Sequence, residues 1–386
     1  MQHVILIPDS FKGTLSSAEI CSVLREEVLR RFPGCTVSCV PVADGGEGSV
    51  DCFLTALGGR RIPVSVCGPF GEPTEAFFGM LPDGKTAVVE MAACAGLPLA
   101  EGRLDPLRAT TFGVGELFLA AAEHGASRII VGLGGSATND GGCGAAAACG
   151  VRFLNRDGMP FVPAGGTLAQ IAQIDASGFS PALRGVEFTA MCDIDNPLFG
   201  PNGASAVFAP QKGASAAQVT LLDDGLRSLA GVISRELSCE VGALPGGGAA
   251  GGMGAGMSAF FGASLRSGIE TVLDTVRFDR MLQTADWVIT GEGRLDSQSL
   301  RGKVVIGVAQ RAKAAGVPVI AVVGDAEDGL DGAYEAGVTA VFPINRRARD
   351  FHEIRHLSRS FLAQTAADIL RLIAQAEQRR PGSPEA

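Results

Sequence analysis

The sequence predicts an α/β protein whose main sheet is built from both ends of the chain. Short apolar runs alternate with helical patterns at the amino end and again in the carboxyl-terminal third, whereas the middle holds extended runs broken by turn sequences. We therefore expect a doubly wound parallel sheet of the Rossmann or flavodoxin type, formed by residues 1–58 and 276–380. Residues 59–275 would be an inserted second, mixed α/β domain, and residues 381–386 a disordered tail.

The amino-terminal elements carry clear local signals. Val4–Ile7 is an apolar run that stops at Pro8 and predicts a strand. A helix follows, because Ser16 can cap it and Glu19 can complete a capping box. Val37–Val42 predicts the second strand.

The middle of the chain predicts a different pattern. Between residues 61 and 91, extended runs separated by "PFGEP" and "PDGK" predict antiparallel hairpins. A helix over about Gly115–His124 leads into a strand at Arg128–Val131. The long helix expected at Ser215–Ser238 opens with a capping box formed by its first residue and Gln218.

The carboxyl-terminal third returns to regular alternation. We expect strands at Trp287–Thr290, Val317–Val323 and Val338–Phe342, and helices at Lys303–Ala315, Gly329–Ala336 and 350–378. The five parallel strands should lie in the order 2-1-3-4-5. The strand order then reverses between the first strand and Trp287–Thr290, where the loops "DSFKGT" (9–14) and "GEGRLDSQ" (291–298) meet. Ligands of open α/β sheets gather at such a point.

Composition excludes several classes of partner. The net charge is −9 and the 32 basic residues are scattered, so neither nucleic acid nor an anionic membrane is expected as a partner. The ten cysteines include no C-x-x-C pair, and the amino end lacks a signal-peptide pattern. We expect a cytoplasmic protein that acts on small molecules, with a homodimer as an open alternative to a monomer.

Two short motifs match well-known expressions in the wrong context. "GMLPDGKT" (79–86) satisfies the phosphate-loop expression, but an alternating, strand-like run follows where a helix would be required. "HEIRH" (352–356) satisfies the zinc-protease expression, but both histidines fall on the polar face of the expected helix. We predict a hairpin for the first and a solvent-exposed pair for the second.

The stretch "GLGGSATNDGGCGA" (132–145) follows a buried strand and concentrates glycine, although glycine costs backbone entropy. Bare amide groups before a helix form an anion-binding concavity. We expect this loop to hold the phosphates of ATP. Asp140 could face a metal ion there, and a tight packing turn remains the alternative. The predicted cofactor-binding residues of the loop are Gly134, Gly135, Ser136, Thr138, Asn139, Gly141 and Gly142.

A second candidate cluster lies in "CDIDNPLFGPNGASAVFAPQKGAS". Asp193 and Asp195 could hold Mg²⁺ from one side of an extended segment, because Mg²⁺ prefers carboxylate and phosphate oxygens. Lys212 is expected at a helix start, where it would bind ATP phosphates. The alternative is an Asx-turn with a solvated lysine. Glycine loops, a carboxylate pair and lysines together favour phosphoryl transfer, hence a small-molecule kinase.

Seven motifs together resemble the type-I glycerate kinases, in unbroken order from residue 1 to about 345: "IPDSFKGTLSS", "VPVADGGEGSV", "GLGGSATNDGG", "CDIDNPLFGPNGAS", "APQKGAS", "GAAGGMGAG" and "TGEGRLDSQSLRGK". The resemblance implies ATP-dependent phosphorylation of D-glycerate, commonly to 2-phosphoglycerate, on a Rossmann-like domain with a second α/β domain. Which hydroxyl accepts the phosphoryl group stays open between 2- and 3-phosphoglycerate.

The roles of single residues rest on their chemistry, because the resemblance does not assign them. Arg294 is our choice for the glycerate carboxylate, which a guanidinium binds bidentately. Glu292 and Asp296 could orient that arginine or ligate a metal ion, and with Arg294 they are the predicted substrate-binding residues. The predicted catalytic residues are Asp9, Lys12, Asp44 and Asp193.

Four rival classes make different demands on the sequence. "GLGGSAT" also resembles the phosphate loop of the galactokinase, homoserine kinase and mevalonate kinase superfamily, whose proline-led approach to that loop is absent here. A nicotinamide oxidoreductase needs a ribose-binding acid after its glycine motif, and no such acid follows. A different hydroxy-acid kinase and a non-catalytic binding module stay as alternatives for experiment.

Overall fold

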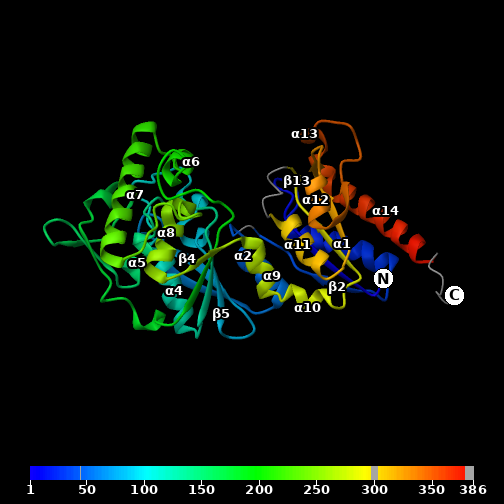
Figure 1. Cartoon of the computed structure of the whole chain (residues 1–386), viewed down its shortest axis with the longest axis horizontal. Coiled ribbons are helices and arrows are strands. Elements are labelled where there is room, and N and C mark those ends of the chain that lie inside the picture. Colours follow the sequence, from blue (N-terminus) through cyan, green and yellow to red (C-terminus); the bar gives the residue numbers. More distant parts are fainter. Residues whose placement is uncertain (44, 297–302, 379–386) are drawn as a thin grey trace. The chain divides into compact units, whose positions relative to one another are not determined.

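The computed structural model describes residues 1–43, 45–296 and 303–378 (Figure 1). Contacts divide the chain into two compact units. Unit 1 comprises Met1–Ala43 and Ile269–Ala386, and unit 2 comprises Asp44–Gly268. The predicted catalytic Asp44 and the tail 381–386 lie outside the described residues.

Unit 1 contains a five-stranded parallel sheet in the order β16-β14-β12-β1-β2. Its strands are β1 (His3–Pro8), β2 (Thr36–Cys39), β12 (Trp287–Gly291), β14 (Val319–Val323) and β16 (Val338–Pro343). Numbered along the chain, this is the order 2-1-3-4-5 expected from the sequence. A short parallel pair, β13 (Arg294–Leu295) and β15 (Asp325–Ala326), lies outside this sheet. The prediction of an α/β fold with a parallel sheet is confirmed.

The helices of unit 1 follow the strands. They are α1 (Ser17–Arg31), α9 (Gly268–Thr275), α10 (Phe278–Leu282), α11 (Val304–Ala314), α12 (Asp331–Ala336), α13 (Phe351–Ile354) and α14 (Ser358–Gln378). The predicted capping box is present at α1, where the Ser16 side chain accepts from the Glu19 amide and the Glu19 side chain accepts from the Ser16 amide. Helix α1 packs on α14, and their apolar faces close the core over β1.

The prediction of one helix over 350–378 is wrong in its first turns. A 3-10 turn at Arg355–Leu357 separates α13 from α14. The Ser358 hydroxyl donates to the Arg355 carbonyl oxygen at 2.8 Å. This side-chain bond competes with the helical backbone pattern. His352 and His356 are both exposed, as predicted, and the described part of the chain contains no cluster of three or more potential metal ligands.

Unit 2 is built on a six-stranded mixed sheet in the order β11-β10-β6-β5-β4-β3. Its strands are β3 (Arg60–Cys67), β4 (Pro73–Met80), β5 (Thr86–Glu90), β6 (Arg128–Gly132), β10 (Glu187–Met191) and β11 (Ser264–Arg266). The predicted hairpins are the antiparallel pairs β3–β4 and β4–β5. Since "GMLPDGKT" forms the turn between β4 and β5, it is not a phosphate loop. The other neighbours pair in parallel.

The helices of unit 2 are α2 (Ser49–Leu57), α3 (Ala92–Ala95), α4 (Phe112–Glu123), α5 (Cys143–Ala148), α6 (Ala204–Phe208), α7 (Ala216–Leu237) and α8 (Ala249–Phe261). A small antiparallel sheet consists of β7 (Arg152–Leu154), β8 (Pro160–Phe161) and β9 (Gln173–Asp175). The predicted capping box of α7, between Ser215 and Gln218, is present. Helix α4 starts three residues earlier than the sequence indicated.

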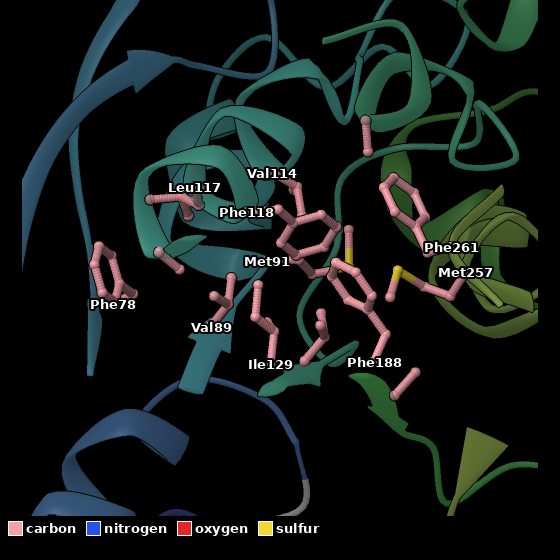
Figure 2. Close-up of a cluster of buried hydrophobic side chains, with 14 of the residues drawn as sticks. Phe78, Val89, Met91, Val114, Leu117, Phe118, Ile129, Phe188, Met257 and Phe261 are labelled. Carbon is pink, nitrogen blue, oxygen red and sulfur yellow. The ribbon is translucent and has the colours of Figure 1, made fainter. Parts of the chain in front are cut away.

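The main core of unit 2 joins strands of its sheet to helices α4 and α8 and is rich in phenylalanine (Figure 2). Phe118 lies edge-on to Phe188 and Phe261, with ring centroids 5.2 Å away in both cases. Val89 and Ile129 project into this cluster from β5 and β6 (Figure 2). The core therefore anchors the strands whose carboxyl ends carry the candidate site.

Each of the ten cysteines is a free thiol. Among the described residues, no helix combines the length and the apolar content needed to cross a membrane.

Candidate active site

The parallel strands β5, β6 and β10 end together at one edge of the unit 2 sheet. Glu90 is paired with Gly132, and Gly132 with Met191, in the register of the three strands. The loops that leave these strands therefore start side by side, and loop residues at carboxyl ends are where open parallel sheets bind ligands. They include the glycine loop 133–142 and the segment 192–198.

Glycines 132 and 134 let two loops touch through their backbones. The Gly134 amide donates to the Gly45 carbonyl oxygen at 2.9 Å. A Cβ at Gly132 would collide with that same oxygen, and one at Gly134 with the Cα of Gly46. At Gly132 and Gly134 the alternative prediction, a tight turn in which glycine permits close packing, is therefore confirmed, because a side chain would prevent the two backbones from coming this close.

The second glycine-rich segment, at the start of α8, packs against the glycine loop 133–142. Ala250, Gly251 and Gly252 all have positive φ, between 53° and 90°. The Gly141 amide donates to the Gly251 carbonyl oxygen at 3.1 Å, and a Cβ at Gly251 would collide with the Thr138 carbonyl oxygen. Gly141 and Gly142 are buried in this contact. The structure thus gives these two predicted nucleotide-binding glycines a packing function.

Lys212 is the buried cation of this edge. It ends the 3-10 turn Pro210–Lys212, and its side chain is only 2% exposed. Its Nζ donates to Ser136 Oγ at 2.8 Å and to the Thr138 carbonyl oxygen at 2.7 Å, across 76 and 74 residues of sequence. The alternative of a solvated lysine is wrong, and so is the expected position at the start of a regular helix. The structure brings together Lys212 and the glycine loop, as predicted.

Lys212 forms no ion pair with any residue that the structure describes. Both of its hydrogen-bond acceptors are neutral oxygens. Burial lowers the pKa of Lys212 to about 7, although the negative field of Asp140 acts in the opposite direction. A buried ammonium without an anionic contact is costly, and an anionic ligand that reaches it would offset the cost.

Asp140, whose carboxylate we expected to face a metal ion, is instead surrounded by donors of the protein. It is fully buried, and its carboxylate accepts from the Thr111 amide at 2.7 Å, the Thr111 hydroxyl at 2.9 Å and the Gly142 and Gly144 amides at 3.1 and 3.2 Å. Burial raises the pKa of Asp140 against these four donors. The carboxylate occupies the start of α5, so the amides of that helix start are used internally.

Two buried polar atoms next to Lys212 have no hydrogen-bond partner within the described chain. They are Thr138 Oγ1 and Asn139 Oδ1, both on residues that are 0% exposed. The other side of the Asn139 amide donates to Ser205 Oγ at 3.2 Å. Buried polar atoms without a hydrogen-bond partner are rare in folded proteins. Where they occur, a bound ligand or an ordered water often supplies the missing partner.

A cavity of about 280 Å³ opens beside this cluster. Gly134, Gly135, Ser136 and Lys212 contribute its polar wall, and the Gly135 and Ser136 amides donate to no protein oxygen among the described residues. The remaining wall is largely apolar. It consists of Gly46, Leu97, Leu133, Met191, Cys192, Asp193, Ile194, Phe208, Gln211, Ala249 and Ala250.

Asp193 reaches this cavity, whereas Asp195 is not among its wall residues. Both side chains are exposed, and Asp193 Oδ1 accepts from the Gly268 amide at 2.8 Å and from Ser267 Oγ at 3.1 Å. Exposed carboxylates two residues apart suit Mg²⁺, which keeps several waters and uses one or two protein oxygens beside phosphate. The magnesium assignment stays a prediction.

A second polar edge lies in unit 1, where β1 and β12 end together. The Asp9 amide donates to the Gly291 carbonyl oxygen at 2.8 Å. The two loops also touch, because a Cβ at Gly293 would lie 3.3 Å from the Lys12 nitrogen of the backbone. The loop meeting expected at the reversal of strand order is therefore present. The two loops carry Asp9, Lys12, Glu292, Arg294 and Asp296.

Arg294 in this edge has a partner that sequence reasoning missed. Its Nη2 donates to Glu327 Oε1 at 2.6 Å, and both side chains are more than two-fifths exposed. Glu327 follows β15, which pairs with β13 and so holds the two residues together. Glu292, by contrast, is 6% exposed.

Glu90 is another residue of the unit 2 edge that sequence reasoning missed. It is 3% exposed, and its carboxylate accepts from the Val50 amide at 2.5 Å and the Gly48 amide at 3.2 Å. Burial raises the pKa of Glu90. The sequence did contain a signal for Glu90, because an acidic residue at the end of an apolar run predicts a position at the edge of the sheet where ligands bind. Glu90 holds the start of α2 beside Gly46.

Comparisons with known proteins agree with the resemblance drawn from the motifs. The profile of the glycerate kinase family matches residues 4–374. A glycerate kinase of Bacillus subtilis is 44% identical over 367 residues, which cover 95% of this chain and 96% of that protein. A glycerate 2-kinase of Escherichia coli K12 is 46% identical over 343 residues, covering 88% and 90%. The crystal structure of a protein described as putative glycerate kinase 2 from Salmonella typhimurium LT2 matches this chain with a TM-score of 0.87. The two sequences are 40% identical, and the match covers 98% of this chain and 99% of that one.

Proposed function

We propose that this chain, which belongs to the glycerate kinase family and is a phosphotransferase, transfers the γ-phosphoryl group of ATP to the 2-hydroxyl of D-glycerate. The proposed binding of ATP is supported above all by Lys212, whose buried ammonium has neutral hydrogen-bond partners and lines the cavity. We also propose a cytoplasmic setting, the doubly wound arrangement of unit 1 and the insertion of a second domain between its segments. The sequence placed this domain at residues 59–275, whereas the contacts assign Asp44–Gly268 to unit 2.

The glycine loop and Lys212 would bind the triphosphate. The amides of Gly135 and Ser136, which have no acceptor among the described residues, would donate to the phosphate oxygens, and the ammonium of Lys212 would supply the positive charge. The Thr138 hydroxyl would complete this shell as a further donor, and Asn139 Oδ1, which only accepts, would hold an ordered water beside the phosphates. These donors stabilise the negative charge that spreads over the phosphate oxygens during transfer.

Asp193 and Asp195 would hold Mg²⁺, which neutralises phosphate charge when it is bound. Their exposure leaves room for the waters and phosphate oxygens that complete a magnesium shell. The cavity position of Asp193 supports its part in this assignment.

Glycerate would bind at the polar edge of unit 1. Arg294 would take the carboxylate bidentately, exchanging its contact with Glu327 for the substrate, while Glu292 and Asp296 orient it. In the transfer, the 2-hydroxyl oxygen bonds to the γ-phosphorus, the bond from that phosphorus to the bridging oxygen breaks, and ADP leaves with the electron pair. The hydroxyl proton passes to a carboxylate, for which Asp9 and Asp44 are the candidates, and Lys12 binds phosphate oxygens.

The deciding experiment incubates the purified chain with ATP, Mg²⁺ and D-glycerate and identifies the product by NMR. We expect 2-phosphoglycerate, and little turnover of L-glycerate, glycerol or homoserine. Formation of 3-phosphoglycerate would overturn the proposed position of transfer, and preference for another hydroxy acid would overturn the substrate. The Asp193→Asn variant should lower kcat, whereas Asp157→Asn, an exposed loop change in the same unit, should not.

A further inference from the structure

The cavity in unit 2 is lined by residues that fall into two chemically different sets, a polar wall and an apolar wall. Its polar wall carries the ammonium of Lys212, the Ser136 hydroxyl and the bare backbone of two glycines. Its apolar wall carries leucine, methionine, isoleucine and phenylalanine side chains together with alanine. A single small polar molecule cannot use both walls, because an apolar surface gains nothing from contact with a hydrated group.

The substrates of the proposed reaction differ in how much apolar surface they offer. D-glycerate bears oxygen on each of its three carbons, and triphosphate and ribose are polar throughout. The nucleobase alone presents a broad, flat face that loses little by leaving water. Ligand cavities combine such apolar contacts with a few polar groups that fix orientation.

Most of the apolar wall stands on well-packed elements. Met191 ends β10 and pairs with Gly132 at the end of β6, and Leu133 follows directly; these two side chains are 1% and 4% exposed. Ala249, also 4% exposed, begins α8. Ile194 and Phe208 complete the wall and are only half-buried, so their apolar surface is left for a ligand to cover.

We propose that Ile194 and Phe208, backed by the buried side chains of Leu133 and Met191, bind the nucleobase of the nucleotide whose phosphates lie against the glycine loop. This inference rests on the proposed nucleotide substrate and adds the base subsite to it. Contact with the wall would depend on the area of the base more than on its hydrogen-bonding edge.

Phe208 is the side chain to change, because it ends a short helix and is not fully buried. Its neighbour Val207 on α6 is 45% exposed and is not part of the cavity wall, which makes Val207→Ala the matched control. Phe208→Leu keeps an apolar side chain of similar size and serves as the conservative variant.

The experiment measures calorimetric binding of ATP and of inorganic tripolyphosphate, which carries the phosphates without a base. Phe208→Ala should weaken ATP binding at least about tenfold, in line with the loss of an aromatic contact to a base, and leave tripolyphosphate binding unchanged. Phe208→Leu should fall between this variant and the native protein, and Val207→Ala should match the native protein. Thermal unfolding of each variant checks that unit 2 remains folded.

Two results would overturn the inference. One is an equal loss for ATP and tripolyphosphate in Phe208→Ala, and the other is unchanged ATP binding. Because the binding measurement needs no glycerate, it separates the two proposals. If Phe208→Ala loses affinity for ATP but not for tripolyphosphate, and the native protein does not phosphorylate glycerate, the base subsite stands and the proposed reaction is rejected. If the native protein phosphorylates glycerate and Phe208→Ala has an unaltered KM for ATP, the reaction stands and the base subsite is rejected.

Discussion

Replacing Lys212 by methionine should remove a pH dependence from the stability of the protein. The substitution keeps an unbranched side chain of similar length but deletes the buried ammonium and its hydrogen bonds to Ser136 and Thr138. Below pH 7 the native lysine is charged both folded and unfolded, so the folded state carries the whole cost of burying the charge. Above pH 7 the folded lysine is neutral, whereas an unfolded lysine keeps its proton.

The magnitude follows from the pKa of Lys212, which burial lowers from 10.5 to about 7. Between these two values the unfolded state binds more protons, so stability rises with pH. Integrated from pH 6 to pH 9, this one group adds about 3 kcal/mol to the free energy of unfolding, at about 1.4 kcal/mol per pH unit above pH 7. The lost hydrogen bonds subtract an amount that does not vary with pH.

The assay is urea unfolding of the native protein and of Lys212→Met at pH 6, 7, 8 and 9. The free-energy difference between variant and native protein should shift by about 3 kcal/mol against the variant across this range. Lys85→Met, which changes an exposed lysine in the β4–β5 turn of the same unit, should show no such shift. Parallel pH curves for Lys212→Met and the native protein would refute the reasoning.

Three further substitutions test other parts of the site. Asp140→Asn replaces a carboxylate that accepts four hydrogen bonds by an amide, half of which is itself a donor. The free energy of unfolding measured by calorimetry should fall by about 3 kcal/mol, and a change within about 0.5 kcal/mol would contradict the four-bond geometry. Glu90→Gln should speed hydrogen exchange at the first amides of α2 about tenfold by weakening its cap, whereas the exposed Glu75→Gln should not; equal exchange in both would show that Glu90 does not hold α2. Arg294→Lys should raise KM for glycerate about tenfold with KM for ATP unchanged, and a change in KM for ATP instead would move Arg294 out of the glycerate site.

Local chemistry made much of the fold predictable. The capping boxes at Ser16 and Ser215 depend on residues three positions apart, so the sequence contains all that they need. Strand–helix alternation limits the connections that a parallel sheet can make, and the observed order of the five strands in unit 1 follows from it. The hairpin at 79–86 was predictable because a strand-like run follows the turn.

Errors arose where a side-chain contact, local or distant, competes with the preference that the sequence pattern indicates. The helix expected over 350–378 is interrupted at Arg355–Leu357, next to a side-chain bond that the apolar pattern does not reveal. Asp140 has the appearance of a metal ligand in the sequence, yet Thr111, distant along the chain, supplies two of its four donors. Glu327 and Glu90 were missed since their partners come from other loops.

The sequence by itself determined the periodicities, the caps, the family and the loops that carry chemistry, because these are properties of neighbouring residues or of whole motifs. Tertiary structure alone decided that Lys212 is buried against the glycine loop, since their contact spans 76 residues and depends on how β6, β10 and α6 pack. It also decided which glycines face the cavity and which ones pack against α8. Burial and pairing are properties of atoms brought together by folding, and a linear pattern does not contain them.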